Sequence, residues 1–263
     1  MKIVDAIALF EKEGSWVTWE NQTRDHVLYG DAQQEVSSIG VCWVATKQAI
    51  EEAIQKGSNF IITHENPFYC TSTRPKTLIH KAIEEKKQLL DKGNICIYRC
   101  HDVWDSIREY GVSDQWAKRL GFTFEPRIQN SYYQYANILP QRVCDLAQHV
   151  ASSLLEDGEN GIYVFGDVHK EVHRLAIGTG AATDIFEMLK EKPDAMIVSD
   201  DGITNYCEAQ YAIDYHVPLL VVHHASCEIA GLKAMVPYLI KHFPTISCTY
   251  LEEGYTIHHF LAK

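Results

Sequence analysis

The chain has 263 residues, 46% hydrophobic and 22% charged, and can bury the core of one large domain or two small ones. Its formal net charge of −11 argues against a nucleic-acid groove, because phosphate contacts need concentrated lysine and arginine. No apolar run approaches the length of a membrane span, and Asp5 interrupts the apolar start of the chain. The eight cysteines contain no C-x-x-C pair, which favours reduced thiols in a cytoplasmic protein over a thiolate zinc site.

A strand–helix–strand unit is the first clear pattern in chain order. Residues 38–45 are apolar and β-branched enough for a strand, Thr46 caps a helix to residue 56, and Gly57 ends it. The apolar run 59–62 then predicts a second strand, so we expect parallel pairing with a right-handed crossover. The other elements expected up to residue 125 are helices over 1–14, 77–92 and 113–120, and a strand over 95–98.

The second half of the chain repeats this alternation. A strand is expected over 132–139, and Pro140, at a first-turn position, opens a helix to about residue 155. We therefore predict an α/β protein of two related lobes with mixed sheets, residues 1–125 and 126–263, which can be interlinked into a single domain. The remaining expected elements are strands over 162–165, 175–177, 195–198, 218–222, 246–250 and 255–261, and helices over 184–190, 204–215 and 229–243.

Histidine and carboxylate side chains follow three of the predicted strands. Because ligands tend to bind at the carboxyl ends of strands in open α/β sheets, this placement predicts a metal site lined by imidazole and carboxylate. Such mixed ligands suit zinc, iron or manganese, and two carboxylates allow two bridged ions. The residues are His64 and Glu65 after 59–62, His101 and Asp105 after 95–98, and His223, His224 and Glu228 after 218–222.

Each cluster alone has a simpler interpretation. A loop histidine beside a solvated glutamate explains His64 and Glu65, and a surface salt bridge explains a histidine four residues before a carboxylate. The repetition of the pattern after three strands is what favours the metal site. Asp200 and Asp201 are either solvated turn residues or substrate contacts, and Gly178-Thr179-Gly180 is either a tight structural turn or an anion-binding loop.

With these motifs, the chain resembles the dinuclear metal-centre family known as GTP cyclohydrolase I type 2 homologues, or NGG-interacting-factor-three-like proteins. The resemblance begins at Trp19-Glu20-Asn21, where the family has Trp-Asp-Asn, and continues to the helix after Glu228. The family sequence Ile-Thr-His-His-Pro is replaced here by Ile62-Thr63-His64-Glu65-Asn66-Pro67. The family's His-x-x-x-Asp matches His101 to Asp105, its Gly-His segment matches His223-His224 before Glu228, and its Thr-Gly-Glu element matches Ser199-Asp200-Asp201.

The resemblance implies a set of ligands and roles. Asp105 and Glu228 would bridge two divalent ions, which we expect in the cleft between the lobes. Glu65 stands where the family has a histidine, and His223 stands where it has a glycine and could supply the missing imidazole. The implied metal ligands are His64, Glu65, Asp105, His224 and Glu228, with His101, Asp201 and His223 as residues that orient a ligand or contact substrate.

Two functions are compatible with this site. The first is a metal-dependent hydrolase of a small, nucleotide-like molecule, for which the sequence assigns no catalytic residue. The second is a metal-binding regulator or metal chaperone without turnover, whose partner is a metal donor or acceptor. The resemblance also implies a ring-shaped homohexamer, and the tyrosine-rich strand Tyr132-Tyr133-Gln134-Tyr135 offers either an interface or a face that packs within its own subunit.

Overall fold

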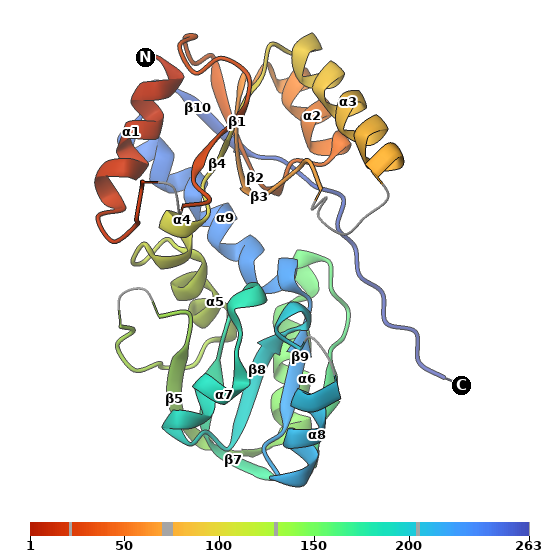
Figure 1. Ribbon diagram of the computed structural model, residues 1–263. Coiled ribbons are helices and arrows are strands. Elements are labelled where there is room, and N and C mark those ends of the chain that lie inside the picture. Colours follow the sequence, from red (N-terminus) through yellow and green to blue (C-terminus); the bar gives the residue numbers. More distant parts are fainter. Residues whose placement is uncertain (21–22, 70–75, 129–130, 204–205, 263) are drawn as a thin grey trace. The chain divides into compact units, whose positions relative to one another are not determined.

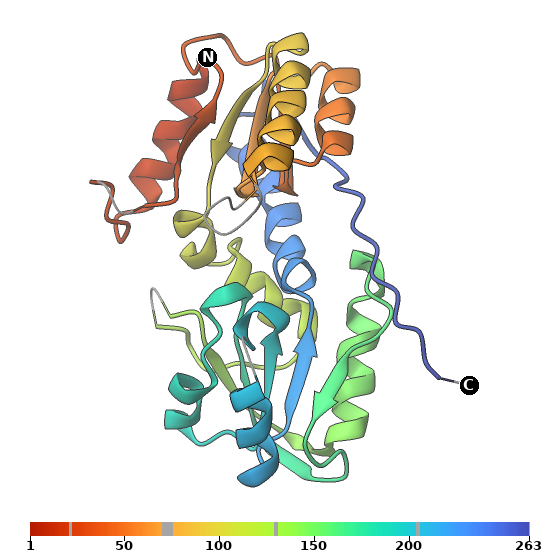
Figure 2. The same ribbon diagram turned by 45° about the vertical axis from the view of Figure 1, so that its right-hand side comes forward.

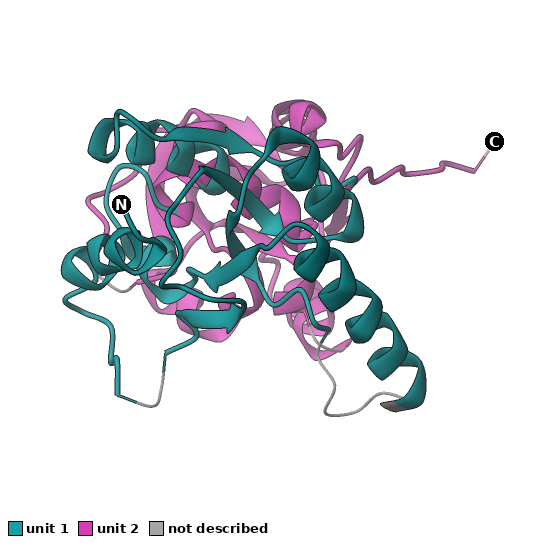
Figure 3. Ribbon diagram, turned by 90° about the horizontal axis from the view of Figure 1, so that it is seen from above, with its two compact units in different colours: residues 1–111, 232–254 teal, residues 112–231, 255–263 magenta. Residues whose placement is uncertain are grey.

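The computed structural model describes residues 1–20, 23–69, 76–128, 131–203 and 206–262, so Asn21 and Thr204 lie outside the described residues. The chain forms two compact units, coloured separately in Figure 3. Unit 1 contains residues 1–111 and 232–254, and unit 2 contains residues 112–231 and 255–263. The units are thus interlinked along the chain, and the expected division at residues 125 and 126 falls inside unit 2.

Unit 1 is an α/β sandwich around a mixed sheet. Among the described residues the strand order is β1-β4-β3-β2-β10, in which β1 is antiparallel to β4 and the other neighbours are parallel. Its elements are α1 (Ile3–Glu13), β1 (His26–Tyr29), β2 (Ser38–Val44), α2 (Lys47–Lys56), β3 (Phe60–Glu65), α3 (Lys76–Lys92), β4 (Cys96–Arg99), α4 (Asp102–Ser106) and β10 (Ser247–Tyr250).

Helices cover both faces of the sheet in unit 1 (Figures 1 and 2). On one face, Ile61 packs with Ile50 of α2 and Leu90 of α3, all of them inaccessible to solvent. On the other, Phe10 of α1 stacks on Tyr98 of β4 at a ring distance of 5.9 Å. Burial of each such large apolar side chain stabilises the unit by about 1.5–3 kcal/mol. As predicted, Thr46 caps α2 by accepting a hydrogen bond from the backbone N–H of Ala49.

Unit 2 has a second mixed sheet with the order β5-β7-β8-β9-β6 among the described residues. Strands β7, β8 and β9 are parallel, whereas β5 and β6 are antiparallel edge strands. Its elements are α5 (Val112–Leu120), β5 (Gln134–Arg142), α6 (Val143–Ser153), β6 (Tyr163–Phe165), β7 (Glu171–Ile177), α7 (Ile185–Met188), β8 (Ala195–Ser199), α8 (Tyr206–Asp214) and β9 (Leu219–Val222). Helix α9 (His224–His242) follows β9, and its residues through Gly231 belong to unit 2.

Alternating side chains of the central strands in unit 2 divide its core between the two faces. Ile197 of β8 packs with Leu146 of α6, whereas Met196 and Val198 pack with Met188 of α7. Helix α6 thus covers one face of this sheet, and α7 and α8, which contribute Met188 and Ala212 to the second cluster, cover the other. These two layers explain why β8 and β9 are continuous apolar runs without a polar face.

Tyr133 and Tyr135 pack against the same cluster as α7 within unit 2. The structure therefore gives this tyrosine face a partner within its own chain, which was one of the two alternatives for the strand. No helix in the described part of the chain is both long and apolar enough to span a bilayer. None of the seven cysteines in the described residues forms a disulfide.

Three predicted elements differ from the structure. The helix expected from Pro140 begins only at Val143, because β5 continues through the proline to Arg142. An edge strand tolerates proline, and the pairing of β5 with β7 shifts register between Asn137 and Gln141. The strand expected over 255–261 is absent from that described segment, where Ile257 makes one isolated bridge with Glu159. Helix α9 begins at His224 rather than at residue 229.

Candidate metal centre

Unit 1 brings His64, Glu65, His101 and Asp105 together, and we call these residues the His64 cluster. Strands β3 and β4 are parallel with Thr63 opposite Arg99, so their carboxyl ends reach the same edge of the sheet. His64 and Glu65 are the last two residues of β3. The chain leaves β4 at Arg99 and turns at once into α4, which carries Asp105 back toward that edge.

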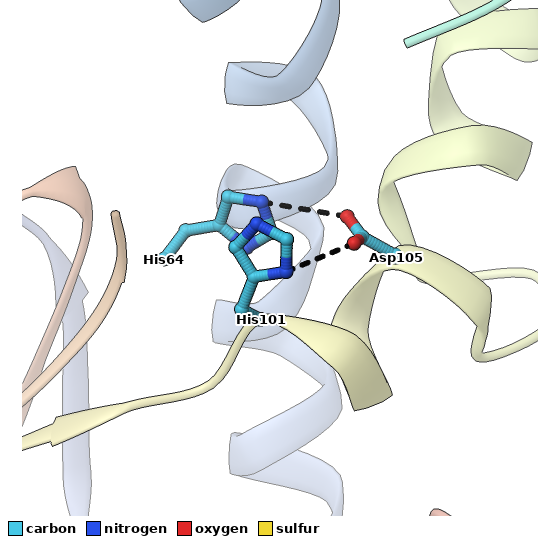
Figure 4. Close-up of side chains that lie close together, drawn as sticks. All are labelled: His64, His101 and Asp105. Atoms are coloured by element: carbon cyan, nitrogen blue, oxygen red, sulfur yellow. Dashed lines mark ion pairs between the residues drawn. The ribbon is translucent and has the colours of Figure 1, made fainter. Parts of the chain in front are cut away.

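A backbone carbonyl orients the ring of His64, which Figure 4 shows together with His101 and Asp105. Its Nδ1 lies 3.2 Å from the carbonyl oxygen of Cys100, and a carbonyl can only accept, so the ring donates through Nδ1–H. This leaves Nε2 facing Asp105 Oδ1 at 3.4 Å, with the His64 and Asp105 side chains almost fully buried. A histidine that donates one ring N–H to a carbonyl and presents the other nitrogen is the usual arrangement of a metal ligand.

His101 lies among three carboxylates. Its Nδ1 is 3.0 Å from Asp102 Oδ1 and 3.0 Å from Asp105 Oδ2, and its Nε2 is 3.5 Å from Glu65 Oε1. Burial lowers the pKa of His101, but the carboxylates, Asp105 above all, outweigh it and raise the pKa well above its ordinary value. The ring also stacks on His64 with the ring centres 4.4 Å apart. Through these contacts His101 can orient the carboxylates of Glu65, Asp102 and Asp105.

The donor atoms in this cluster are close enough to share an ion. One ligand atom each from His64, His101 and Asp105 lie within 4.8 Å of one another. The structure thus adds His101 to the candidate donors, whereas the resemblance implied only an orienting role for it. Three buried or half-buried imidazole and carboxylate donors fit a divalent ion such as zinc, iron or manganese.

Arg99 was not recognised from the sequence, yet it fixes Glu65. Its Nη2 donates to Glu65 Oε2 at 2.6 Å, and its Nε donates to the carbonyl oxygen of His64 at 2.9 Å. Burial raises the pKa of Glu65, but the hydrogen bond from His101 and electrostatic interactions with His64, His101 and Arg99 lower it to about 2. Glu65 is therefore a carboxylate at neutral pH, with one oxygen toward Arg99 and the other toward His101.

The role of Asp25 was likewise not recognised from the sequence. It is 4% exposed and accepts hydrogen bonds from three consecutive backbone N–H groups, those of His101, Asp102 and Val103. These are the donors that the first turn of a helix leaves unsatisfied, so Asp25 fixes the start of α4. The position of Asp105, one turn later, depends on that start. A lone aspartate between α1 and β1 carries no sequence signal for this role.

Unit 2 holds a second group, Asp201, His224 and Glu228, which we call the His224 cluster. Strands β8 and β9 are parallel with Ser199 opposite Val222, so both again end at one edge of their sheet. Asp201 follows β8 in a 3₁₀ turn. His224 opens α9, and Glu228 follows one helical turn later on the same face.

His224 repeats the arrangement of His64. Its Nδ1 is 2.8 Å from Asp201 Oδ2, and its Nε2 is 3.0 Å from Glu228 Oε2. Burial lowers the pKa of His224, but Glu228 and Asp201 raise it to about 9. Asp201 was expected to orient a ligand or contact substrate, and its hydrogen bond to Nδ1 is the kind of contact that orients a metal-binding imidazole.

Gly180 leaves open the space beside these two side chains. A Cβ at this position would lie 2.3 Å from Glu228 Oε1 and 2.7 Å from His224 Nε2. Its φ of +54° is also a conformation that other residues rarely adopt. The structure has a 3₁₀ turn at Gly180–Ala182, so this segment is a tight turn that packs against the His224 cluster. The space and the donor types fit an ion bound by His224 and Glu228.

His223 takes no part in either cluster among the described contacts. Its backbone N–H lies 3.2 Å from Glu159 Oε2, and its Nε2 lies 3.8 Å from Asp200 Oδ2. Its Nδ1 accepts from the backbone N–H of Ala225, 3.2 Å away. His223 therefore caps the start of α9, and its ring does not meet Glu228 in any recorded contact.

Comparison with known proteins identifies the family to which this chain is related. The sequence profile of Duf34/NIF3 (NGG1p interacting factor 3) matches residues 1–253. A Clostridium acetobutylicum protein named GTP cyclohydrolase 1 type 2 homolog is 26% identical over 197 residues, 72% of this chain and 70% of that protein. A Clostridium perfringens protein of the same name is 23% identical over 210 residues, 76% of this chain and 78% of that protein.

The fold is shared with solved structures. A Bacillus cereus protein related to NIF3 superposes with a TM-score of 0.78 at 16% identity, covering 100% of this chain and 99% of that one. A Staphylococcus aureus hypothetical protein gives a TM-score of 0.78 at 19% identity, with 99% of each chain covered. These likenesses establish the fold, and the profile match over residues 1–253 establishes the relationship. The chain therefore belongs to the Duf34/NIF3 family.

Proposed function

We propose that this protein binds two divalent metal ions through His64, Glu65, Asp105, His224 and Glu228 and uses them to hydrolyse a small molecule. The observation that supports the proposal is the repeated arrangement in the two units. In each, a histidine has Nδ1 engaged by an acceptor and Nε2 facing a buried carboxylate. A metal-binding histidine almost always donates its other ring N–H to a carboxylate, a carbonyl or a water in this way.

The residues of the chain have distinct roles in this proposal. Asp105 and Glu228 would each offer a carboxylate ligand to the ions, and Asp201 and the carbonyl of Cys100 hold the two imidazoles in their binding orientation. Ions held by these residues would supply Lewis acidity and lower the pKa of a bound water. Arg99 and His101 hold Glu65 ionised, which keeps its carboxylate available to a cation. The name of the relatives, GTP cyclohydrolase 1 type 2 homolog, supports a nucleotide-like substrate.

A metal carrier without turnover is the second candidate, and Arg99 favours it. A guanidinium 2.6 Å from a Glu65 oxygen places a permanent positive charge beside the His64 cluster. Such a charge weakens the hold of the cluster on a cation and so eases metal release. In this case the partner is a metal donor or acceptor. For either function, we propose a cytoplasmic location, which the cysteine pattern favours, and the homohexamer that the family resemblance implies.

Turnover distinguishes the two candidates. The full-length protein would be loaded separately with zinc, manganese or iron(II) and assayed against nucleotides, phosphate esters and cyclic amides. The hydrolase predicts saturable, metal-dependent product formation that disappears in Glu228→Gln. Metal passing reversibly to a chelator, with no product from any member of the panel, would support the carrier and contradict the hydrolase.

A further inference from the structure

Unit 2 contains a cavity beside the His224 cluster that the proposed ligands do not use. Its volume is about 510 Å³, within the range of small-molecule sites. The walls come from the segment before β5, the turn after β7, the start of α7, the turn after β8, and α8. The side chains that define its chemistry are Tyr132, Tyr133, Asp184, Phe186, Asp201 and Glu208.

Hydrogen bonds within unit 2 fix the walls in place. The hydroxyl of Tyr133 donates to the carbonyl oxygen of Ala182 at 2.7 Å and accepts from the backbone N–H of Asp184 at 3.2 Å. Asp184 in turn caps α7 by accepting from the N–H groups of Phe186 and Glu187. Thr183 donates to the carbonyl oxygen of Gly180. The cavity is therefore held open by the fold before any ligand arrives.

The charged groups that line the cavity are all carboxylates: Asp184, Asp201 and Glu208. No lysine, arginine or histidine is among the described residues that line it. One oxygen, Glu208 Oε2, is buried and has no hydrogen-bond partner among the described residues. A buried carboxylate oxygen without a hydrogen-bond partner is costly, so this position favours a ligand that donates an N–H group.

The rest of the lining is aromatic. Tyr132, Tyr133 and Phe186 offer ring faces or edges, and flat heterocycles stack on such rings. A free phosphate group would meet three negative charges and no cation. The combination of aromatic walls with carboxylate acceptors selects planar rings that carry amino or ring N–H groups.

The cavity also meets the His224 cluster through one shared residue. Asp201 lines the cavity, and its Oδ2 binds His224 Nδ1 at 2.8 Å. A ring seated in the cavity is therefore separated from the metal-binding imidazole by a single carboxylate. The cavity therefore lies on the Nδ1 side of His224, whereas Nε2 on the other side of the ring faces Glu228 Oε2 at 3.0 Å.

We propose that this cavity binds a planar nitrogen heterocycle with N–H donors, using Glu208 as its acceptor and Phe186 as a stacking wall. If this heterocycle is the substrate of the hydrolase, the inference rests on the proposed function. Binding of the heterocycle in the cavity is tested separately, without any metal. The heterocycle would be the end of the substrate held by unit 2, and phosphate groups would lie outside the cavity.

The test uses a pair of nucleosides that differ in one amino group. Binding of 2-aminopurine riboside to the full-length protein, stripped of metal by a chelator, is followed by quenching of its fluorescence. Purine riboside, which lacks the amino group, is the competitor. We expect saturable quenching, and a competitor about tenfold weaker, because it lacks the N–H that pairs with Glu208.

Variants locate the site. Glu208→Ala and Phe186→Ala each should weaken binding of 2-aminopurine riboside about tenfold, through the lost acceptor and the lost stacking wall. Glu187→Ala is the matched control, because Glu187 is an exposed carboxylate on α7 that does not line the cavity. Unchanged affinity in both test variants, equal affinity for the two nucleosides, or no quenching would overturn the proposal.

Two results keep this inference separate from the proposed function. Nucleoside binding that depends on Glu208, in a protein that shows no hydrolysis, supports the cavity while contradicting the hydrolase. Metal-dependent hydrolysis that Glu208→Ala and Phe186→Ala leave unchanged supports the hydrolase and overturns the cavity as its substrate site. Manganese binding that depends on Glu208, without nucleoside binding, identifies the cavity as a cation site and likewise overturns the proposal.

Discussion

At the scale of single residues, the proposed metal sites depend on which ring nitrogen of each histidine faces which oxygen. His64 and His224 each have Nδ1 engaged, by Cys100 O and Asp201 Oδ2 respectively. Their Nε2 atoms then face Asp105 and Glu228, which are each 3% exposed. The sequence shows a histidine four residues before a carboxylate, as in His224 and Glu228. The orientation of the two rings could not be predicted, because it depends on a backbone carbonyl and on Asp201 in the turn after β8.

Gly180→Ala tests the space at the His224 cluster. The new Cβ would overlap Glu228 Oε1 and His224 Nε2, so we expect metal content to fall by more than half while the fold remains. Gly121→Ala is the matched control, because Gly121 has a similar φ of +73° and its Cβ would meet nothing within 4 Å. Both substitutions cost about 1–2 kcal/mol of backbone strain, but only the Cβ in Gly180→Ala meets the donor atoms of His224 and Glu228. Equal metal content in the two variants, measured by elemental analysis, would show that the space at Gly180 has no role in binding.

Glu65→His tests metal preference at the His64 cluster. A carboxylate is a harder ligand than an imidazole, so the substitution should shift selectivity toward zinc and away from manganese or magnesium. The change also removes the partner that Arg99 holds at 2.6 Å. Titration of the two metal-free proteins with each metal measures the shift. Identical selectivity would remove Glu65 from the set of ligands.

At the scale of elements, the start of α9 shows what sequence rules missed. Helix-start rules look for serine, threonine, aspartate or asparagine just before the apolar pattern. Here His223 caps the helix through its ring nitrogen, and Asp200, from the turn after β8, accepts from the N–H of His224. The capping residue is a histidine, which these rules do not include, and the contact with Asp200 spans 24 residues of chain, so the helix was predicted to begin five residues too late. The error matters, because the true start puts His224 and Glu228 on one helical face.

The predictable parts of the site are those set by local pattern. Apolar runs before His64, His101 and His224 are buried parallel strands, and parallel strands of one sheet end at a common edge. Asp25 and Arg99 could not be predicted, because their roles depend on tertiary contacts across 76 and 34 residues of chain. Likewise, Pro140 follows a helix-start rule that the edge position of β5 overrides.

Lys86 of α3 ties three elements together and carries a prediction for pH. It is 4% exposed, and its Nζ donates to the carbonyl oxygens of Ala45 and Pro67, at 3.0 and 2.6 Å. Burial lowers the pKa of Lys86 from 10.5 to about 8. Between those two pH values the unfolded chain holds a proton that the folded chain has lost, so folding becomes more favourable as pH rises.

The comparison with Lys86→Met isolates this contribution. The difference in free energy of unfolding between the wild type and the variant should change in favour of the wild type between pH 8 and 10. Below pH 8 Lys86 is protonated in both the folded and the unfolded wild type, so the difference in free energy of unfolding should not change with pH. Urea unfolding at pH 7, 8.5 and 10 measures it, and parallel curves across that range would contradict a lowered pKa.

At the scale of the whole molecule, unit 1 carries three of the five proposed ligands and unit 2 carries the other two. The chain passes from unit 1 to unit 2 and back, and its last residues return to unit 2. Such interlinking makes independent folding of a fragment cut at residue 125 unfavourable, because that fragment lacks β10 of its sheet. Experiments on this protein therefore need the full chain.

Assembly is the prediction that belongs to this scale. The family resemblance implies a homohexamer, so light scattering of the untagged protein should give a mass near six times the 30.0 kDa of the chain. The face of Tyr133 and Tyr135 is occupied within its own unit, so the interface should lie elsewhere. A mass equal to a single chain at working concentration would contradict the hexamer.

Anomalous diffraction from crystals of the metal-loaded protein tests the central claim most directly. Data collected on either side of the absorption edge of zinc or manganese locate each ion and identify it. We expect anomalous peaks about 2.0–2.3 Å from Nε2 of His64 and Nε2 of His224, with carboxylate oxygens of Asp105 and Glu228 also at ligand distance from the peaks. Loaded crystals with no anomalous peak at ligand distance from either cluster would contradict it.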